Sequence, residues 1–69
     1  MRLSARNQIK GKIVDVQKGA TTSHVRVEIA PGQIVTASIT NEAVEELGVK
    51  VGAAATVVIK ASDVMIGVD

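Results

Sequence analysis

The chain reads His24-Val25-Arg26-Val27-Glu28-Ile29, then Ala30-Pro31-Gly32-Gln33, then Ile34-Val35-Thr36-Ala37-Ser38-Ile39. Apolar residues recur at every second position on both sides of the middle four: Val25, Val27, Ile29, Val35, Ala37 and Ile39. This alternation is typical of strands with one buried face. Proline in the second and glycine in the third position of the middle four favour a tight turn. The stretch therefore predicts a β-hairpin, around which the remaining elements can be arranged.

Further strands are expected on both sides of this hairpin. The first covers Ile9 to Val16, where Gly11 suits a bulge or a close backbone approach. Its apolar residues divide between the two faces as Ile9 with Ile13, and Val14 with Val16. Both faces of this strand should therefore be partly covered. Two later apolar runs, Ala54 to Lys60 and Asp63 to Val68, predict the last two strands.

A short helix is expected between the hairpin and the last two strands. The Thr40 hydroxyl can cap its start, and Gly48 suits its left-handed end. The apolar residues between them form one helical stripe: Ala43, Val44 and Leu47. Three strands, a short helix and two strands is the element order of the OB fold. We therefore predict an all-β fold with one short helix, an OB-fold five-stranded Greek-key barrel.

Length and composition indicate one small domain, residues 1–69, that needs support from other subunits. The 69 residues are 46% hydrophobic, with no aromatic residue, no cysteine and a single histidine. A core of this size is marginal by itself, and disulfides and metals are nearly excluded as supports. We therefore expect a homo-oligomer. The alternative is a small monomer with a well-filled barrel.

Charge is unevenly distributed, although the formal net charge is only +1. Residues 1–26 hold six Lys or Arg and one Asp, whereas residues 27–69 hold two Lys and six Asp or Glu. Halves of opposite sign attract each other, within a chain or between subunits. The small net charge argues against a dedicated nucleic-acid binder. The absence of aromatic rings also removes the base stacking on which single-strand-binding OB folds rely.

No constellation for catalysis or for a metal cation is visible. His24, the single histidine, lies in the alternating strand without a carboxylate at a motif spacing, and we interpret it as an outward-facing strand residue. The glutamates of the predicted helix have no His or Cys at ligand spacing. The first residues show no secretory pattern, and no run is long enough to span a bilayer. We expect a cytoplasmic, non-enzymatic protein without a cofactor, a membrane partner or a nucleic-acid partner.

Hydrogen-bond donors suited to an oxyanion occur in three places. Ser4-Ala5-Arg6-Asn7-Gln8 offers a hydroxyl, a guanidinium and two amides, with no carboxylate before Asp15. The helix start at Thr40 adds a hydroxyl and backbone amides at the positive end of the helix dipole. Lys60 is the only cation after Val51. Plainer interpretations stay open: the first segment can be a solvated arm, and Lys60 can end a strand in solvent.

Three segments together carry a family resemblance. They are Ser4-Ala5-Arg6-Asn7-Gln8 with Gly11, Glu45-Glu46-Leu47-Gly48-Val49 with Gly52, and Ile59-Lys60-Ala61-Ser62-Asp63-Val64-Met65. In these segments the chain resembles the molbindin family, the molybdate-binding Mop domain, and the match covers essentially the whole chain. The resemblance implies an OB-fold domain that assembles as a hexamer, a trimer of dimers. It also implies that molybdate or tungstate binds between subunits.

The resemblance also implies which residues bind the anion. In the principal site these are Ser4, Arg6, Lys60 and the backbone of Ala61 from one subunit, with Thr40 and Ala43 from a neighbour. The family commonly has serine at the position of Ala43, so Ala43 can offer only its backbone amide. A second site is implied near the loop after the first strand, at Lys18, Gly19, Ala20, Thr21, Thr22 and Ser23.

The implied function is molybdate or tungstate binding for the storage and homeostasis of molybdenum. Molybdate is fully deprotonated at neutral pH, so a site built only from donors suits it. Two alternatives from other classes stay open: a regulatory module that signals molybdate to a partner, and an OB-fold nucleic-acid binder. Such regulatory modules are normally fused to a DNA-binding or ATPase domain, which these residues do not contain.

Overall fold

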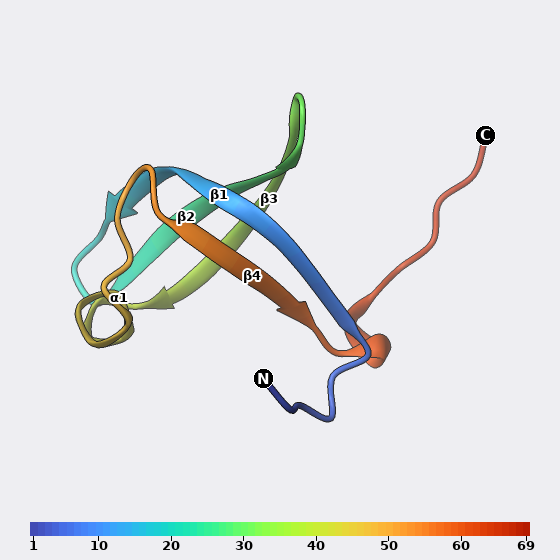
Figure 1. Ribbon diagram of the computed structural model, residues 1–69, viewed down its shortest axis with the longest axis horizontal. Helices are drawn as coiled ribbons and strands as arrows, with labels where there is room; N and C mark the ends of the chain where they lie inside the picture. The colour runs from blue at the N-terminus through green and yellow to red at the C-terminus, as the bar shows by residue number, and fades with distance from the viewer.

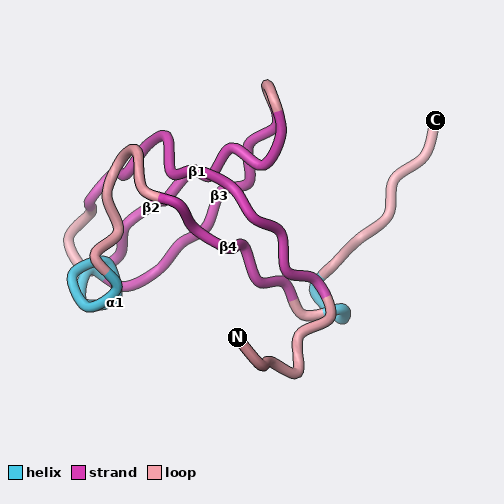
Figure 2. The backbone as a smooth tube through the Cα atoms, viewed as in Figure 1, coloured by secondary structure: helices cyan, strands magenta, loops and turns pink.

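A four-stranded antiparallel sheet forms the body of the protein in the computed structural model, which describes residues 1–69 (Figure 1). The strands are β1 (Asn7–Lys18), β2 (Thr22–Ala30), β3 (Gln33–Thr40) and β4 (Ala54–Ile59), in the spatial order β3-β2-β1-β4. The helix α1 (Asn41–Leu47) lies between β3 and β4 in the chain, and a 3₁₀ helix, η1 (Ala61–Asp63), follows β4. The two short helices lie at opposite ends of the sheet (Figure 2). The predicted order of the first four strands and the helix is confirmed.

The hairpin between β2 and β3 forms as predicted. Ala30 pairs with Gln33, so Pro31 and Gly32 alone make the turn. Gly32 has a φ of 76°, which glycine adopts without a steric cost. Along the two strands, Val25 lies opposite Ala37 and Val27 opposite Val35, so the apolar positions share one face.

A bulge in β1 decides which of its side chains reach the core. The register with β2 shifts between Ile13 and Asp15, which makes Val14 an extra residue on β1. Ile13 therefore lies opposite Val27, and Val16, instead of Val14, shares that face. Val14 is exposed. The expectation that Val14 and Val16 share a face is therefore wrong, because the extra residue reverses the alternation.

Gly11 lies where β1 passes between its two partner strands. A Cβ atom on Gly11 would stand 2.6 Å from the Glu28 carbonyl oxygen and 2.7 Å from a methyl group of Val27. Real Cβ atoms do not approach backbone that closely, so only glycine fits. The expected close backbone approach is confirmed at Gly11, whereas the bulge lies farther along the strand.

The core enclosed by one chain is very small. Only four of the 69 residues are buried: the apolar Ile13, Val25 and Val27, and the polar Ser23. One side of the core stays open as a mainly apolar hollow of about 260 Å³, lined in part by Ile39, Leu47 and Val58. Leu47, expected in the buried stripe of the helix, is 74% exposed. The inner face of the sheet is therefore only partly covered by the chain's own residues.

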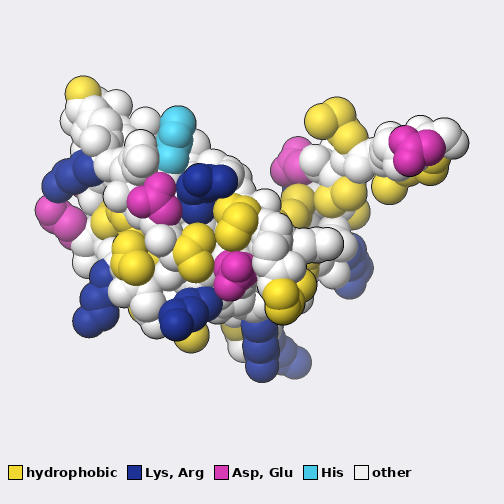
Figure 3. Space-filling view, turned by 90° about the horizontal axis from the view of Figure 1, so that it is seen from above, with side chains coloured by type: hydrophobic (Ala, Val, Ile, Leu, Met, Phe, Trp, Pro, Cys, Tyr) yellow, Lys and Arg dark blue, Asp and Glu magenta, His cyan; other side chains and the backbone are white.

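The predicted fifth strand, Asp63 to Val68, does not form within the chain. Asp63 belongs to η1, and residues 64–69 have no strand partner. This tail leads away from the sheet, so the free edges of β3 and β4 lie beyond its reach (Figures 1 and 3). Met65 is 92% exposed and Val68 is 91% exposed. None of the helices combines the length and the apolar composition that crossing a bilayer requires.

Candidate functional site

Four of the predicted site residues lie together where β1 begins and β4 ends. Asn7 pairs with Ile59, and its side-chain amide also donates to the Ile59 carbonyl oxygen at 3.1 Å. Arg6 precedes this pair and Lys60 follows it, so the two cations flank the same end of the sheet. We call this group, Ser4, Arg6, Lys60 and Ala61, the cationic end. Its residues are exposed, and neither Arg6 nor Lys60 forms an ion pair within the chain.

The other two predicted residues lie at the start of α1. Thr40 caps the helix, and its hydroxyl oxygen accepts from the Ala43 amide at 3.1 Å. The Asn41 amide donates to the Thr21 carbonyl oxygen at 2.9 Å. The amides expected to be unpaired are therefore partly engaged already, because Thr40 and the neighbouring loop take two of them. The Thr40 hydroxyl keeps its own hydrogen for another acceptor.

The cationic end and the start of α1 do not meet within one chain. The cationic end lies beside η1, and α1 lies at the opposite end of the sheet (Figures 1 and 2). Each group offers donors and neither surrounds a cavity of its own. The structure thus brings together Ser4, Arg6, Lys60 and Ala61, and separately Thr40 and Ala43.

Asn41 fastens the loop that contains the predicted second site. Its side-chain nitrogen donates to the carbonyl oxygens of Gly19 and Ala20, at 3.0 and 3.3 Å. Its side-chain oxygen accepts from the Ser23 hydroxyl at 2.6 Å. Ser23 is fully buried, so within the chain its hydroxyl serves this bond and does not face solvent.

The hydrogen bonds of this loop leave it with free donors and occupied acceptors. The carbonyl oxygens of Gly19 and Ala20 accept from the Asn41 side chain, that of Thr21 from the Asn41 amide, and that of Thr22 from the Gly19 amide. The amides of Ala20 and Thr21 have no hydrogen-bond partner within the chain. Adjacent backbone amides of this kind favour an anion.

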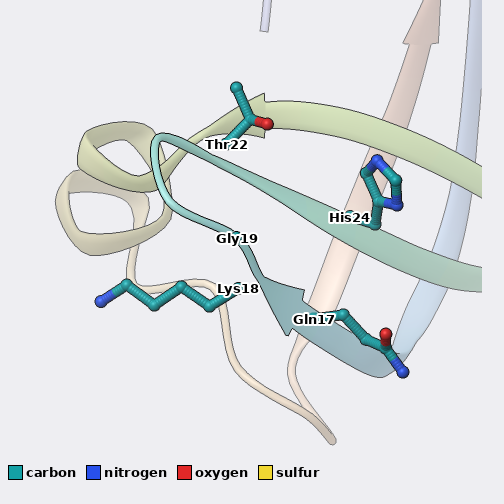
Figure 4. A pocket seen from close by; sticks show the side chains of 5 residues that line it. All are labelled: Gln17, Lys18, Gly19, Thr22 and His24. Carbon is teal, nitrogen blue, oxygen red and sulfur yellow. The ribbon is translucent and has the colours of Figure 1, made fainter.

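A polar hollow of about 230 Å³ lies beside this loop, lined by Gln17, Lys18, Gly19, Thr22 and His24 (Figure 4). None of the five is hydrophobic. The Lys18 side chain extends away from the other labelled side chains, and its Nζ lies 3.9 Å from Oε1 of Glu45 on α1. Both side chains are largely exposed, so this contact contributes little to stability.

Sequence reasoning did not assign Asn41, Gln17 or His24 to a site. Asn41 follows the capping Thr40, and only the return of β2 beside α1 brings it to the loop. Gln17 and His24 lie opposite each other in the β1–β2 register. The bulge at Val14 sets this pairing, and the sequence pattern gives no sign of it.

Comparisons with known proteins agree with this geometry. Residues 3–66 match the family model described as the TOBE domain. Molybdenum-pterin-binding protein 1 of Clostridium pasteurianum is 56% identical over 66 residues, covering 96% of this chain and 97% of that protein. MopII from Clostridium pasteurianum, in an apo form, superposes with a TM-score of 0.89 and 52% identity, covering 97% of this chain and all of MopII. ModG, a cytoplasmic molybdate-binding protein with molybdate bound, gives a TM-score of 0.94 at 45% identity, covering this whole chain and 49% of ModG.

Replacing Asn41 should destabilise the fold and release the loop. Asn41→Ala leaves the buried Ser23 hydroxyl without its acceptor, and we expect a loss of about 1–3 kcal/mol in the free energy of unfolding. Adding Ser23→Ala should recover part of this loss, because the unsatisfied hydroxyl is then removed as well. Urea unfolding at one fixed protein concentration measures both, with Gln33→Ala as the exposed control. A loss below about 0.5 kcal/mol for Asn41→Ala would show that the clamp is unimportant.

Proposed function

Because the chain belongs to the TOBE domain family, within the molbindin group of molybdenum-pterin-binding proteins, we propose that it binds molybdate. The observation that carries the proposal is the cationic end, where Arg6 and Lys60 flank one end of the sheet without any ion pair. A tetrahedral dianion accepts hydrogen bonds through all its oxygens, and Ser4, Arg6 and Lys60 can only supply donors to it. Charge-assisted bonds of this kind are the strong ones.

The principal site is shared between subunits. The cationic end of one chain supplies Ser4, Arg6, Lys60 and the backbone of Ala61. The helix start of a neighbour supplies the Thr40 hydroxyl and the amide at Ala43. Separation of the two groups within one chain supports this arrangement, because a single copy cannot close both around one anion. To donate to the anion, the Ala43 amide must exchange its bond to Thr40 for one to the ligand.

Assembly also completes the fold. The inner face of the sheet is open, and the edges of β3 and β4 have no partner. The apolar tail, residues 64–68, points away from its own sheet. We propose that the tail of a second copy lies between β3 and β4 as the fifth strand and closes an OB barrel. The full assembly is the hexamer, a trimer of dimers, that the family resemblance implies.

The second site lies at the loop from Lys18 to Ser23, where the free amides of Ala20 and Thr21 support an anion. Residues 1–69 form one Mop domain with both sites. The protein is not an enzyme in this proposal, and it binds molybdate or tungstate for the storage and homeostasis of molybdenum. The cytoplasm is its proposed location, which is also that of ModG.

Arg6→Lys should weaken molybdate binding without dissolving the assembly. The lysine ammonium keeps the charge but cannot donate through a planar fork, so we expect a loss of roughly tenfold in affinity. Calorimetry measures the affinity and size-exclusion chromatography the assembly. Arg2→Lys, the same change four positions earlier, is the matched control and should bind normally. Equal affinity in all three proteins would leave Ser4 to Gln8 as a solvated arm.

Mixing subunits tests whether the site is shared. Lys60→Ala damages the cationic end, and Thr40→Ala damages the helix start. Refolded together, these two variants should regain some tight molybdate sites, because certain interfaces then combine two intact halves. The control mixture of Lys60→Ala with Arg6→Ala damages the same half in every subunit and should regain none. If neither mixture recovers tight binding, the residues do not act across an interface.

A further inference from the structure

We propose that His24 and Gln17 are anion-binding residues of the polar hollow, and that protonated His24 is its cation. This inference rests on the proposed function, because it takes the bound anion to be molybdate. It extends the second site from the loop onto the outer face of the sheet. The loop residues Lys18 to Ser23 would then form only one wall of that site.

Strand pairing places these side chains around one space. Gln17 on β1 lies directly opposite His24 on β2, so their side chains leave the same face of the sheet. Thr22 precedes His24 by two residues and shares that face as well. Figure 4 shows the Thr22 and His24 side chains on the same side of β2. The hollow of about 230 Å³ is about seven times the share of liquid volume taken by one water molecule, which leaves room for a tetrahedral oxyanion.

The surroundings of the hollow favour an anion over a cation. The nearby loop carbonyls of Gly19 and Ala20 are turned to Asn41, so their oxygens are occupied. The amides of Ala20 and Thr21 remain free to donate. Gln17 and Thr22 add a side-chain amide and a hydroxyl, which can both donate. No carboxylate lines the hollow.

A positive charge inside the hollow has to come from His24. The Lys18 ammonium points away and lies 3.9 Å from a carboxylate oxygen of Glu45, so its charge is directed elsewhere. An imidazole gains a positive charge and a second N–H donor when it is protonated, a change that occurs near neutral pH. Binding of a dianion should therefore favour the protonated ring.

The charged groups near His24 do not oppose this effect. Its partner across β3 is the neutral Ser38, and its partner on β1 is the neutral Gln17. Arg26 follows two residues later on the same face, and Asp15 lies opposite Arg26 on β1. These two charges are of opposite sign and adjacent, so their combined field at His24 is weak. The imidazole is thus the nearby group that a bound dianion influences most.

The single histidine makes a site-specific test simple, because its ring signals in an NMR spectrum need no assignment. Dilute molybdate is added at about pH 6 and about pH 8, on either side of the usual histidine value of about 6.5. The ring signals should shift on addition, and the shift should saturate at about threefold to tenfold lower molybdate at the lower pH. Arg6→Lys, which disables the principal site, should keep this behaviour.

Calorimetry on His24→Gln in the Arg6→Lys background gives the complementary result. Affinity at about pH 6 should fall to the value measured at about pH 8, because glutamine donates but never gains charge. Lys50→Gln removes one exposed positive charge elsewhere and should leave the pH dependence unchanged. Ring signals that stay fixed while calorimetry records bound molybdate would overturn the role of His24 alone. If the native protein binds no molybdate at all, the proposed function fails as well.

Discussion

The unpaired edges of β3 and β4 are the feature on which the rest of the structure depends. Each edge presents backbone amides and carbonyls without partners, and between them the apolar inner face of the sheet lies open. A chain with three buried apolar side chains cannot offset the conformational entropy of 69 residues by itself. The apolar tail after η1 has the opposite problem, since Met65 and Val68 are almost fully exposed. A second copy that places its tail between β3 and β4 would solve both problems at once.

The same incompleteness explains the division of the anion site. The cationic end and the start of α1 lie at opposite ends of the sheet, so each is half of a binding site in one chain. Neither half carries a carboxylate that would neutralise Arg6 or Lys60 within the chain. An anion bound between copies would therefore hold them together through charge, in addition to the apolar contacts of the tail. Ligand binding and assembly should then stabilise each other.

Much of this fold is predictable from the sequence, because the signals involved are local. The alternation in β2 and β3, the Pro31-Gly32 turn, and the Thr40 and Gly48 helix ends each depend on neighbouring residues. The bulge at Val14 is different, since it is visible only in the register between β1 and β2. The tail shows the same limit: its composition favours a strand, but a strand also needs a partner edge, and within one chain none is in reach.

The site is predictable to the same degree. The cationic end is found from the sequence because Arg6 and Lys60 sit beside recognisable segments. Asn41 and His24 are not found, because their roles follow from long-range pairing of β2 with α1 and β1. The free amides of Ala20 and Thr21 belong to the same class, since they are left over after Asn41 has bound the loop carbonyls.

Native mass spectrometry of the purified protein, with and without molybdate, tests the central claim most directly, because it reports subunit number and bound oxyanions together. The shared site predicts a hexamer that carries bound molybdate, with no molybdate on any monomer. A monomer that binds molybdate one to one would contradict it, because the complete site would then lie within a single chain.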